Sequence, residues 1–206
     1  MYYVSISGVH GIGKTTICRL LARRNRWYYS PEIVDSLLSP PQFGPKSSEK
    51  LYSELWHMRQ LIIRESELKK QKGEVFIADR WWQDLAIYSQ VLLSPKEYRM
   101  MESVITAVPK EVPDMEIVLW APDEDVLTRV RKRNRLAAEM WAEDDIDYLK
   151  KLNSRFKKYY EDFKDIRNVV LVECSENVEE TYQRVKKVVL QSVVDEKQRK
   201  LGEYEK

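Results

Sequence analysis

Residues 8 to 15 of the chain, Gly-Val-His-Gly-Ile-Gly-Lys-Thr, have the residue types and the spacing of a phosphate-binding loop. The glycines of such a G-x-x-x-x-G-K-[ST] segment let successive backbone N–H groups turn toward an anion, where a side chain would block the turn. Lys14 is expected to reach the outer phosphates of a nucleotide, and the Thr15 hydroxyl is expected to bind Mg²⁺. The segment therefore predicts a binding site for ATP together with Mg²⁺.

The sequence around this loop supports the prediction. Residues 2–7 are aromatic or β-branched apart from two serines, as in a strand, and residues 16–22 have the spacing of an amphipathic helix. Strand, glycine-rich loop and helix are the order that this motif requires, and the start of the helix adds partial positive charge. The residues that we expect to contact the nucleotide are Gly8, His10, Gly11, Ile12, Gly13, Lys14, Thr15 and Thr16.

A second candidate feature is an acid and a base, Asp79 and Arg80, that follow the apolar run 75–78. Such a run is typical of a parallel strand buried on both faces. Asp79 is placed to hold the water shell of the metal or the acceptor, and Arg80 to bind a phosphate through two hydrogen bonds. The structural alternatives are a helix cap for Asp79 and an ion pair for Arg80.

A third feature is the basic run 129–135, which contains four arginines and a lysine. It predicts either a lid over the phosphates, at about residues 131–145, or a solvated helix face. Within it, Arg133 and Arg135 are the candidates for stabilising the transferred phosphoryl group. On the long helix expected at 49–72, Trp56 is a candidate for stacking against the acceptor's base, or else a core residue.

The elements that must position these residues alternate along the chain, as expected for a parallel sheet covered by helices on both faces. After the first strand, strand patterns occur at residues 27–29, 74–79, 115–120 and 168–173. Helix patterns occur at residues 16–22, 49–72, from 94, 123–133, 145–164 and from about 178. Ligands of such α/β sheets bind beyond the carboxyl ends of the strands, so the loop, Glu32, Asp79 and Arg80 should share one rim.

The composition indicates a single domain over residues 1–195, followed by a polar tail, 196–206, that is expected to fray. Because 35 basic side chains face 33 acidic ones, the net charge of +2 gives no reason to expect a nucleic-acid partner. No apolar run has the length that a membrane span needs. Cys18 and Cys174 form no disulfide framework, so we expect a cytoplasmic protein. Its expected partners are small-molecule nucleotides, because of the phosphate-binding loop.

Together these motifs resemble thymidylate kinase. The resemblance rests on the loop from Gly8 to Thr16, on the pair Asp79-Arg80 after a third strand, and on Pro113-Asp114 before the next strand. It implies a three-layer α/β/α P-loop kinase fold with a five-stranded parallel sheet, commonly as a homodimer. The implied reaction is phosphoryl transfer from ATP, with Mg²⁺, to a nucleoside monophosphate such as dTMP. It also implies that Arg59 contacts the acceptor's phosphate and that the basic run is the lid.

Several positions depart from that family. Ser7 and His10 stand where its members usually carry acids, and Trp81 stands where they carry Tyr or His. The segment from Ser30 to Val34 resembles instead the deoxynucleoside kinases, the sister family. A 5′-hydroxyl acceptor benefits from a carboxylate base, for which Glu32 is the candidate, whereas a monophosphate needs only a cationic clamp.

Three functions therefore stay open. Because Arg59 and Arg80 supply a clamp, the sequence favours the monophosphate acceptor. A deoxynucleoside kinase and a nucleotide-binding regulator without catalysis are the alternatives. A GTPase is excluded, because its guanine-selecting N-K-x-D segment does not occur in the chain.

Overall fold

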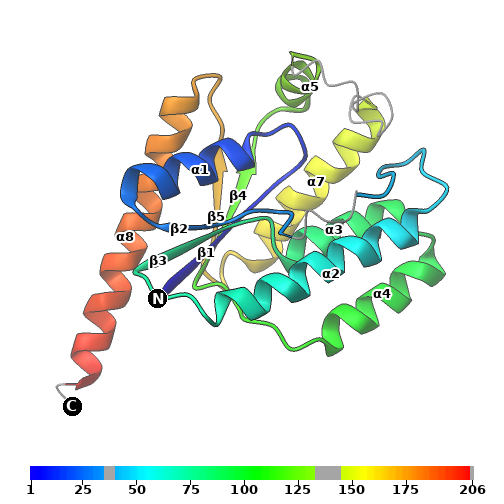
Figure 1. The fold of residues 1–206 in the computed structure, drawn as a ribbon. Helices are drawn as coiled ribbons and strands as arrows, with labels where there is room; N and C mark the ends of the chain where they lie inside the picture. Colours follow the sequence, from blue (N-terminus) through cyan, green and yellow to red (C-terminus); the bar gives the residue numbers. More distant parts are fainter. Residues whose placement is uncertain (35–39, 133–144, 205–206) are drawn as a thin grey trace.

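A five-stranded parallel sheet with helices on both faces forms the framework of the protein (Figure 1). The computed structural model describes residues 1–34, 40–132 and 145–204. The sheet has the order β2-β3-β1-β4-β5, and every pair of neighbouring strands is parallel. Its strands are β1 (Tyr2–Ser7), β2 (Tyr28–Ser30), β3 (Val75–Asp79), β4 (Met115–Trp120) and β5 (Val169–Glu173). The predicted fold class is confirmed.

The helices form the two outer layers. On one side of the sheet lie α1 (Lys14–Asn25) and α8 (Val178–Tyr204), and on the other lie α2, α3, α4 and α7 (Figure 1). Their bounds are Lys50–Leu68 for α2, Trp82–Leu92 for α3, Pro95–Ala107 for α4 and Ile146–Phe163 for α7, while α5 spans Asp123–Lys132. No helix in the described ranges is both long enough and apolar enough to span a membrane.

The core is densest around β1, which hydrogen-bonds to β3 on one side and to β4 on the other. All six of its residues are buried, and Val4 and Ile6 are fully inaccessible to water. Both faces of the strand are buried, as is typical of a central parallel strand, and the alternating serines Ser5 and Ser7 accept buried hydrogen bonds from Gln83. The loop that follows β1 is therefore attached to the central, buried strand of the sheet.

Helix α3 is the main element that the sequence patterns do not predict. Eight of its eleven residues are buried, among them the polar residues Gln83, Asp84 and Ser89. A helix buried on most sides lacks the apolar stripe by which a surface helix is recognised. Helix α3 packs between α2, α4 and α7, so it lies inside its layer.

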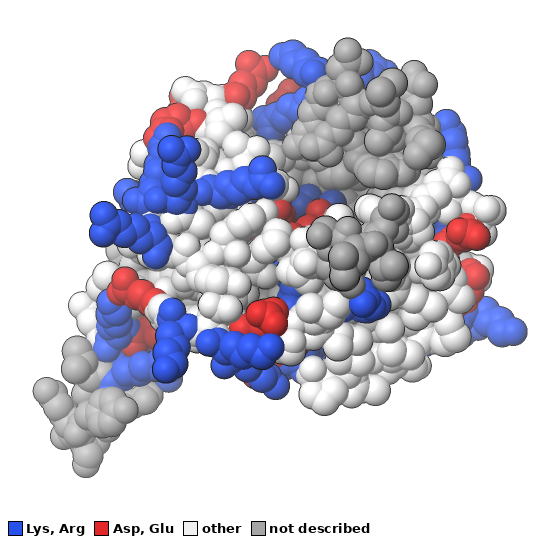
Figure 2. Space-filling model, viewed as in Figure 1, with Lys and Arg blue, Asp and Glu red and all other residues white. Residues whose placement is uncertain are grey.

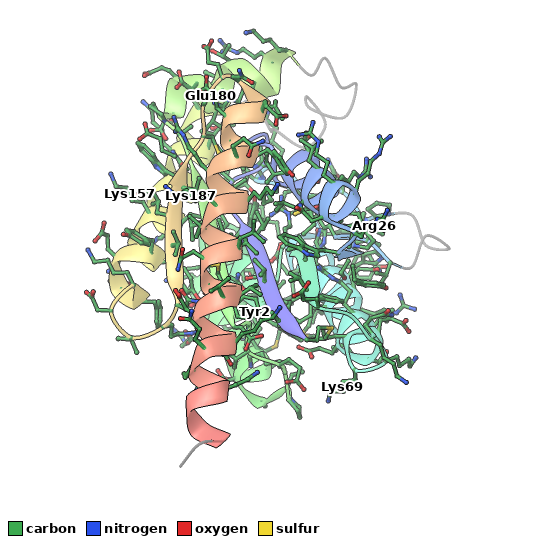
Figure 3. The ribbon with its side chains drawn as sticks, turned by 90° about the vertical axis from the view of Figure 1, so that its left-hand side faces the viewer. Tyr2, Arg26, Lys69, Lys157, Glu180 and Lys187 are labelled. Atoms are coloured by element: carbon green, nitrogen blue, oxygen red, sulfur yellow. The ribbon has the colours of Figure 1, made fainter. Side chains whose placement is uncertain are left out.

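The C-terminal segment also differs from the prediction. Residues expected to fray continue α8 as a regular helix to Tyr204. Glu196 forms ion pairs with Arg199 and Lys200, one turn away, which stabilise an exposed helix. Figure 3 shows this end of α8 extending beyond Tyr2, at the start of β1.

Candidate active site

The phosphate-binding loop connects β1 to α1, and its three glycines have backbone angles that other residues rarely adopt. The φ angles are +140° at Gly8, +80° at Gly11 and +110° at Gly13. Two of these glycines are also required by close packing. A Cβ atom on Gly8 would lie 2.6 Å from the carbonyl oxygen of Leu119, and one on Gly11 would lie 2.3 Å from a methyl group of Val130.

Lys14, the first residue of α1, closes this loop. Its ammonium group donates hydrogen bonds to the carbonyl oxygens of Gly8, at 2.8 Å, and Val9, at 2.9 Å. Burial, together with repulsion from Arg80, lowers the pKa of Lys14 to about 8. The ammonium group is thus held above the start of α1, where an anion is favoured.

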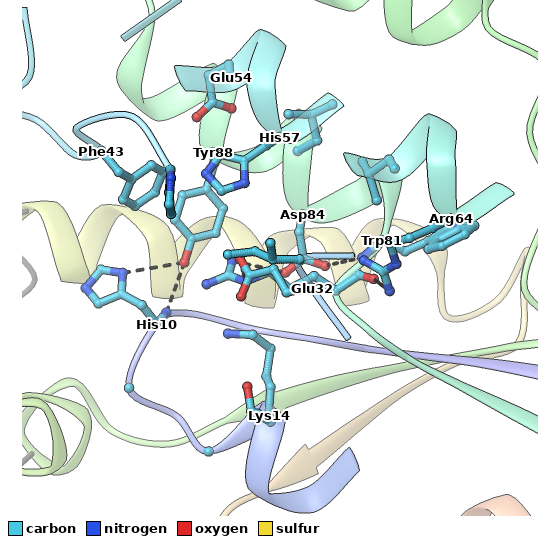
Figure 4. Close-up of a pocket in the computed structure, with 18 of the residues that line it drawn as sticks. His10, Lys14, Glu32, Phe43, Glu54, His57, Arg64, Trp81, Asp84 and Tyr88 are labelled. Carbon is cyan, nitrogen blue, oxygen red and sulfur yellow. Dashed lines mark hydrogen bonds and ion pairs between the residues drawn. The ribbon is translucent and has the colours of Figure 1, made fainter. Parts of the chain in front are cut away.

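A cavity of about 500 Å³ opens beside the loop, between the carboxyl ends of the strands and helices α2 and α3 (Figure 4). The predicted site residues that line it are His10, Gly11, Gly13, Lys14, Thr15, Thr16, Glu32 and Arg80. In the view of Figure 2, basic side chains gather over α1, whose exposed arginines include Arg19 at the cavity. The site therefore lies at the rim formed by the carboxyl ends of the strands, which is where the fold class predicts it.

Arg80 lies at the centre of the polar groups in this cavity. Its backbone has φ +64°, a left-handed conformation that is uncommon for a residue with a side chain. Its guanidinium group forms an ion pair with Glu32 at 2.8 Å and a longer one with Asp84 at 3.6 Å. Burial, the largest single effect, would raise the pKa of Glu32, but the basic side chains of Arg80, His57, Lys14 and Arg64 together outweigh it and hold this pKa below its ordinary value. Glu32 is therefore an ionised carboxylate at neutral pH.

A second arginine, Arg64 on α2, fixes the backbone beneath this ion pair. It donates hydrogen bonds to the hydroxyl of Ser30 at 3.0 Å and to the carbonyl oxygen of Arg80 at 2.9 Å. Its guanidinium carbon lies 4.9 Å from the ring centre of Trp81. Arg64 thereby joins the end of β2 to the turn after β3, through hydrogen bonds from its Nε and Nη2 atoms.

The two acids near this turn occupy different surroundings. Asp84 lines the cavity, and it accepts hydrogen bonds from the Ser7 hydroxyl at 2.7 Å and from the backbone N–H of Trp81 at 3.1 Å. Asp79 is buried behind the cavity and accepts a hydrogen bond from the Tyr29 hydroxyl at 3.3 Å. Ser7, at the position where thymidylate kinases usually carry an acid, thus orients the carboxylate of α3.

The residues suited to Mg²⁺ are few. Among the described residues, no cluster of three or more His, Cys, Asp or Glu side chains is close enough to hold a metal ion. Mg²⁺ in kinases usually keeps several waters and takes only one or two protein groups besides the phosphates, so a cluster is not required. Thr15 and Asp84 both line the cavity and fit such a site, whereas Asp79, the predicted metal-binding acid, is buried and does not line it.

On its α2 side, the cavity contains Glu54 and His57, and burial favours the neutral form of each. The Glu54 carboxylate accepts a hydrogen bond from the Ser89 hydroxyl at 2.8 Å through one oxygen, and its other oxygen has no partner among the described residues. Burial raises the pKa of Glu54 to about 7, and it lowers the pKa of His57 to about 4. This end of the cavity is therefore close to neutral.

Two substrate-binding predictions on α2 are not supported by the geometry. Arg59 is exposed, and it is not among the described residues that line the cavity. Trp56 is buried but also outside that lining, and its ring packs edge-on against His57, with ring centres 5.0 Å apart. The stacking and clamp roles given to them have no contact with the cavity to support them.

The remaining predictions divide as follows. Gly8 and Ile12 belong to the loop but do not line the cavity, and Arg133 and Arg135 lie outside the described residues. Arg129, from the same basic run, donates hydrogen bonds to the carbonyl oxygens of Ile12, Cys174 and Ser175. Its role is thus to join the loop to α5 and to the segment after β5.

The polar cavity residues that sequence reasoning missed include Arg64, Glu54, Asp84 and Tyr88. One signal for two of them was present in the sequence. Asp84 and Tyr88 are spaced by four residues, which places their side chains on one face of a helix if a helix follows the strand end.

The comparisons with known proteins agree with this site. The family model described as deoxynucleoside kinase matches residues 4–195. The chain belongs to the family of deoxynucleoside and thymidylate kinases. The predicted resemblance is thereby confirmed, and the protein is a nucleoside or nucleotide kinase, a phosphotransferase of an ATP-using P-loop family.

Two relatives illustrate the range of this family. A probable thymidylate kinase of Archaeoglobus fulgidus is 30% identical over 198 residues, which cover 90% of this chain and 93% of that protein. A deoxyadenosine/deoxycytidine kinase of Bacillus subtilis is 26% identical over 178 residues, covering 78% of this chain and 77% of the relative.

Among solved structures, a deoxyadenosine kinase from M. mycoides with dCMP and dCDP bound superposes with a TM-score of 0.78. It shares 17% sequence identity, and the match covers 92% of this chain and 99% of that one. At this identity the likeness shows the fold alone. The kinase family is established, while the relatives differ in the acceptor that their names give.

Proposed function

We propose that this protein is a deoxynucleoside kinase, which transfers the terminal phosphoryl group of ATP to the 5′-hydroxyl of a deoxynucleoside. The observation that carries the proposal is the ion pair between Glu32 and Arg80 inside the cavity. A neutral hydroxyl must lose a proton as it attacks, and an ionised carboxylate within reach of it can accept that proton. Glu32 has the charge state that this role requires.

The other cavity residues fit the same reaction. The loop amides and Lys14 would bind the phosphates of ATP, and positive charge around the transferred group is the main contribution of the protein. Mg²⁺, held by Thr15 and a nearby carboxylate, would neutralise charge on the phosphates. Arg80 orients Glu32 and offers a cation beside the attacking oxygen.

The clamp that would favour a monophosphate acceptor is weaker than the sequence indicated. Arg59 is exposed and does not line the cavity, while Arg64 hydrogen-bonds to Ser30 and Arg80 forms its ion pair with Glu32. A second phosphate would also lie near the carboxylates of Glu32 and Asp84. Phosphorylation of dTMP is nevertheless the second candidate, because the Archaeoglobus fulgidus relative named a probable thymidylate kinase reaches 30% identity.

A coupled assay with ATP and a panel of deoxynucleosides and deoxynucleoside monophosphates tests the choice of acceptor. We expect a deoxynucleoside to be the better acceptor, with Glu32→Gln lowering kcat about 100-fold or more through loss of the base. Glu49→Gln, an exposed carboxylate at the start of α2, is the matched control and should keep full activity. A preference for dTMP, with Glu32→Gln close to neutral, would instead establish the second candidate.

We also infer that two copies of the chain pair through α2. Tyr52, Leu55 and Ile62 on this helix are large apolar residues with exposed fractions of 59%, 37% and 46%. Exposed apolar side chains along one helix are typical of a contact surface. Light scattering after gel filtration should give a dimer for the wild type and a monomer for Leu55→Glu/Ile62→Glu; a monomeric wild type would refute the pairing.

A further inference from the structure

Tyr88 lies beside the phosphate-binding loop, next to His10 (Figure 4). Its hydroxyl oxygen accepts a hydrogen bond from the backbone N–H of His10 at 3.0 Å, and it lies 3.4 Å from the Nδ1 atom of the same histidine. The guanidinium carbon of Arg80 lies 4.7 Å from the centre of the Tyr88 ring. One side chain of α3 thus contacts both the ATP side and the acceptor side of the cavity.

The hydrogen-bonding capacity of this hydroxyl suits such a bridge. A phenol donates one hydrogen bond and accepts two. Burial raises the pKa of Tyr88 to about 12, so the proton stays on the oxygen and can be donated to Nδ1 of His10. The His10 amide donates to this oxygen, while the Arg80 guanidinium lies over the ring. Tyr88 can therefore hold both neighbours at once, one through its hydroxyl and the other through its ring.

His10 is the residue at which this loop departs most clearly from thymidylate kinases, and its surroundings give that departure a use. An acid at this position would place a negative charge in the loop, whereas an imidazole has a ring nitrogen, Nδ1, within reach of the Tyr88 hydroxyl. The ring of His10 also stacks on the ring of Tyr148 at the start of α7, with centres 5.5 Å apart. His10 is thus held between α3 and α7.

The Arg80 side chain, in turn, is held by few groups. Its backbone is fixed by the hydrogen bond from its own N–H to Ile6 and by the one from Arg64 to its carbonyl oxygen. Its guanidinium group contacts Glu32, Asp84 and Tyr88. Of these three, Tyr88 is the one that also bonds to the phosphate-binding loop.

Building on the proposed function, we propose that Tyr88 is a positioning residue that couples the phosphate-binding loop to the Arg80–Glu32 pair. Its hydrogen bond to His10 makes its position depend on the conformation of the loop. Its contact with Arg80 sets the orientation of the Glu32 carboxylate. The coupling makes the position of the base depend on a correctly formed ATP site. Tyr88 acts through its neighbours, and its hydroxyl takes no part in proton transfer from the acceptor.

Tyr88→Phe tests the coupling, because it removes only the hydroxyl and keeps the ring beneath Arg80. We expect kcat with the deoxynucleoside acceptor to fall about 10-fold, the effect of losing roughly one buried hydrogen bond. The KM for the acceptor should change less than about threefold. Tyr159→Phe is the matched control, since its half-buried hydroxyl bonds to Glu116 on β4, away from the cavity, and it should leave kcat unchanged.

A double-mutant cycle with Glu32→Gln separates coupling from a general structural effect. If Tyr88 acts by orienting Glu32, its replacement should cost little further kcat once the carboxylate is gone, so the two effects are not additive. Glu32→Asp provides a second background with higher residual turnover. His10→Asn keeps a side-chain acceptor near the position that Nδ1 occupies in the wild type. This variant should retain more activity than His10→Ala.

The outcomes that overturn the proposals are distinct. Additive effects of Tyr88→Phe and Glu32→Gln, or a kcat that Tyr88→Phe leaves unchanged, refute the coupling and leave the proposed function standing. If Glu32→Gln does not lower turnover of a deoxynucleoside, the proposed function fails and the coupling falls with it. Thermal melting of each variant shows that any loss of kcat belongs to a folded protein.

Discussion

Burial acts in different directions on the ionisable side chains of the cavity. It lowers the pKa of Lys14 to about 8 and raises that of Glu54 to about 7, in each case toward the neutral form. Glu32 and Arg80 keep their charges because each compensates the other at 2.8 Å. The cavity therefore contains one ion pair, Glu32–Arg80, whose charges are stable, while Lys14 and Glu54 lose their charges more easily. Catalysis is expected to depend on that pair.

Glu54 makes the stability of the protein depend on pH. Its pKa of about 7 in the folded protein exceeds its ordinary value of 4.5, so the folded state binds this proton more tightly than the unfolded chain does. The resulting stabilisation is complete below about pH 4.5 and is lost as the pH rises through 7.

Glu54→Gln removes this titration. The free energy of unfolding of the wild type, relative to the variant, should fall by about 2 kcal/mol between pH 5 and pH 8. Urea unfolding of both proteins at a series of pH values measures it, with Glu49→Gln as the control for loss of one carboxylate. A difference that does not change with pH would show that Glu54 is ionised throughout.

At the scale of elements, the junction between β1 and α1 depends on its contacts with α5. The Gly11 backbone packs so closely against Val130 of α5 that a Cβ atom would lie 2.3 Å from a methyl group. Arg129, one residue earlier on α5, bonds to the carbonyl oxygen of Ile12. Helix α5 thus holds the outer side of the loop in place.

Gly11→Ala should destabilise the protein by about 2–3 kcal/mol, from the clash with Val130 together with strain at φ +80°. The same clash should displace the loop and weaken the binding of ATP. Adding Val130→Ala gives the new methyl group room, so part of the ATP binding should return. Gly73→Ala is the control, because its Cβ atom would meet nothing within 4 Å. Thermal melting and ATP titration measure both effects; if the second substitution brings no recovery, the contact with α5 does not set the loop.

Features that depend on local sequence were predicted well, whereas features that depend on how helices pack were not. The loop, β4 and the start of α8 were predicted closely, because glycine spacing, an apolar run and helix-start residues are local signals. Glu32 and Arg80 were predicted to share a rim because both follow strands. Arg59 was given a role that contact with the cavity does not support, while Arg64 was missed.

The reason that Arg64 rather than Arg59 lines the cavity is geometric. Five residues along a helix correspond to a rotation of roughly 140°, so Arg59 and Arg64 face different directions. Which of them meets the cavity depends on how α2 packs against the sheet, and the resemblance alone does not contain that information. Helix α3, and with it Asp84 and Tyr88, was missed because a buried helix carries no amphipathic pattern.

At the scale of the whole molecule, α8 both completes the core and extends beyond it. Its side chains Val185, Val189 and Val193 are buried against the sheet, whereas residues 197–200 are exposed. Near the start of β1, the Tyr2 hydroxyl hydrogen-bonds to Ser192, and Lys197 forms an ion pair with Glu74. The packed part of the helix therefore ends close to Val193.

A chain that ends at Asp195 should fold and retain its kinase activity. It loses only exposed ion pairs, which contribute little, so we expect the melting temperature to fall by no more than about 3 °C. A chain that ends at Lys187 loses Val189 and Val193 from the core and should melt far lower or fail to fold. If the shorter deletion alone abolished folding, the proposed domain boundary at residue 195 would be wrong.

The left-handed backbone at Arg80 implies an evolutionary conflict at a single position. Glycine would relax that conformation by about 1 kcal/mol, but it would also remove the cation that compensates the carboxylates of Glu32 and Asp84, and loss of one partner of a buried pair costs about 3–5 kcal/mol. The strained backbone is therefore retained because of the side chain that it carries. We expect that screens for heat resistance alone will keep arginine at position 80.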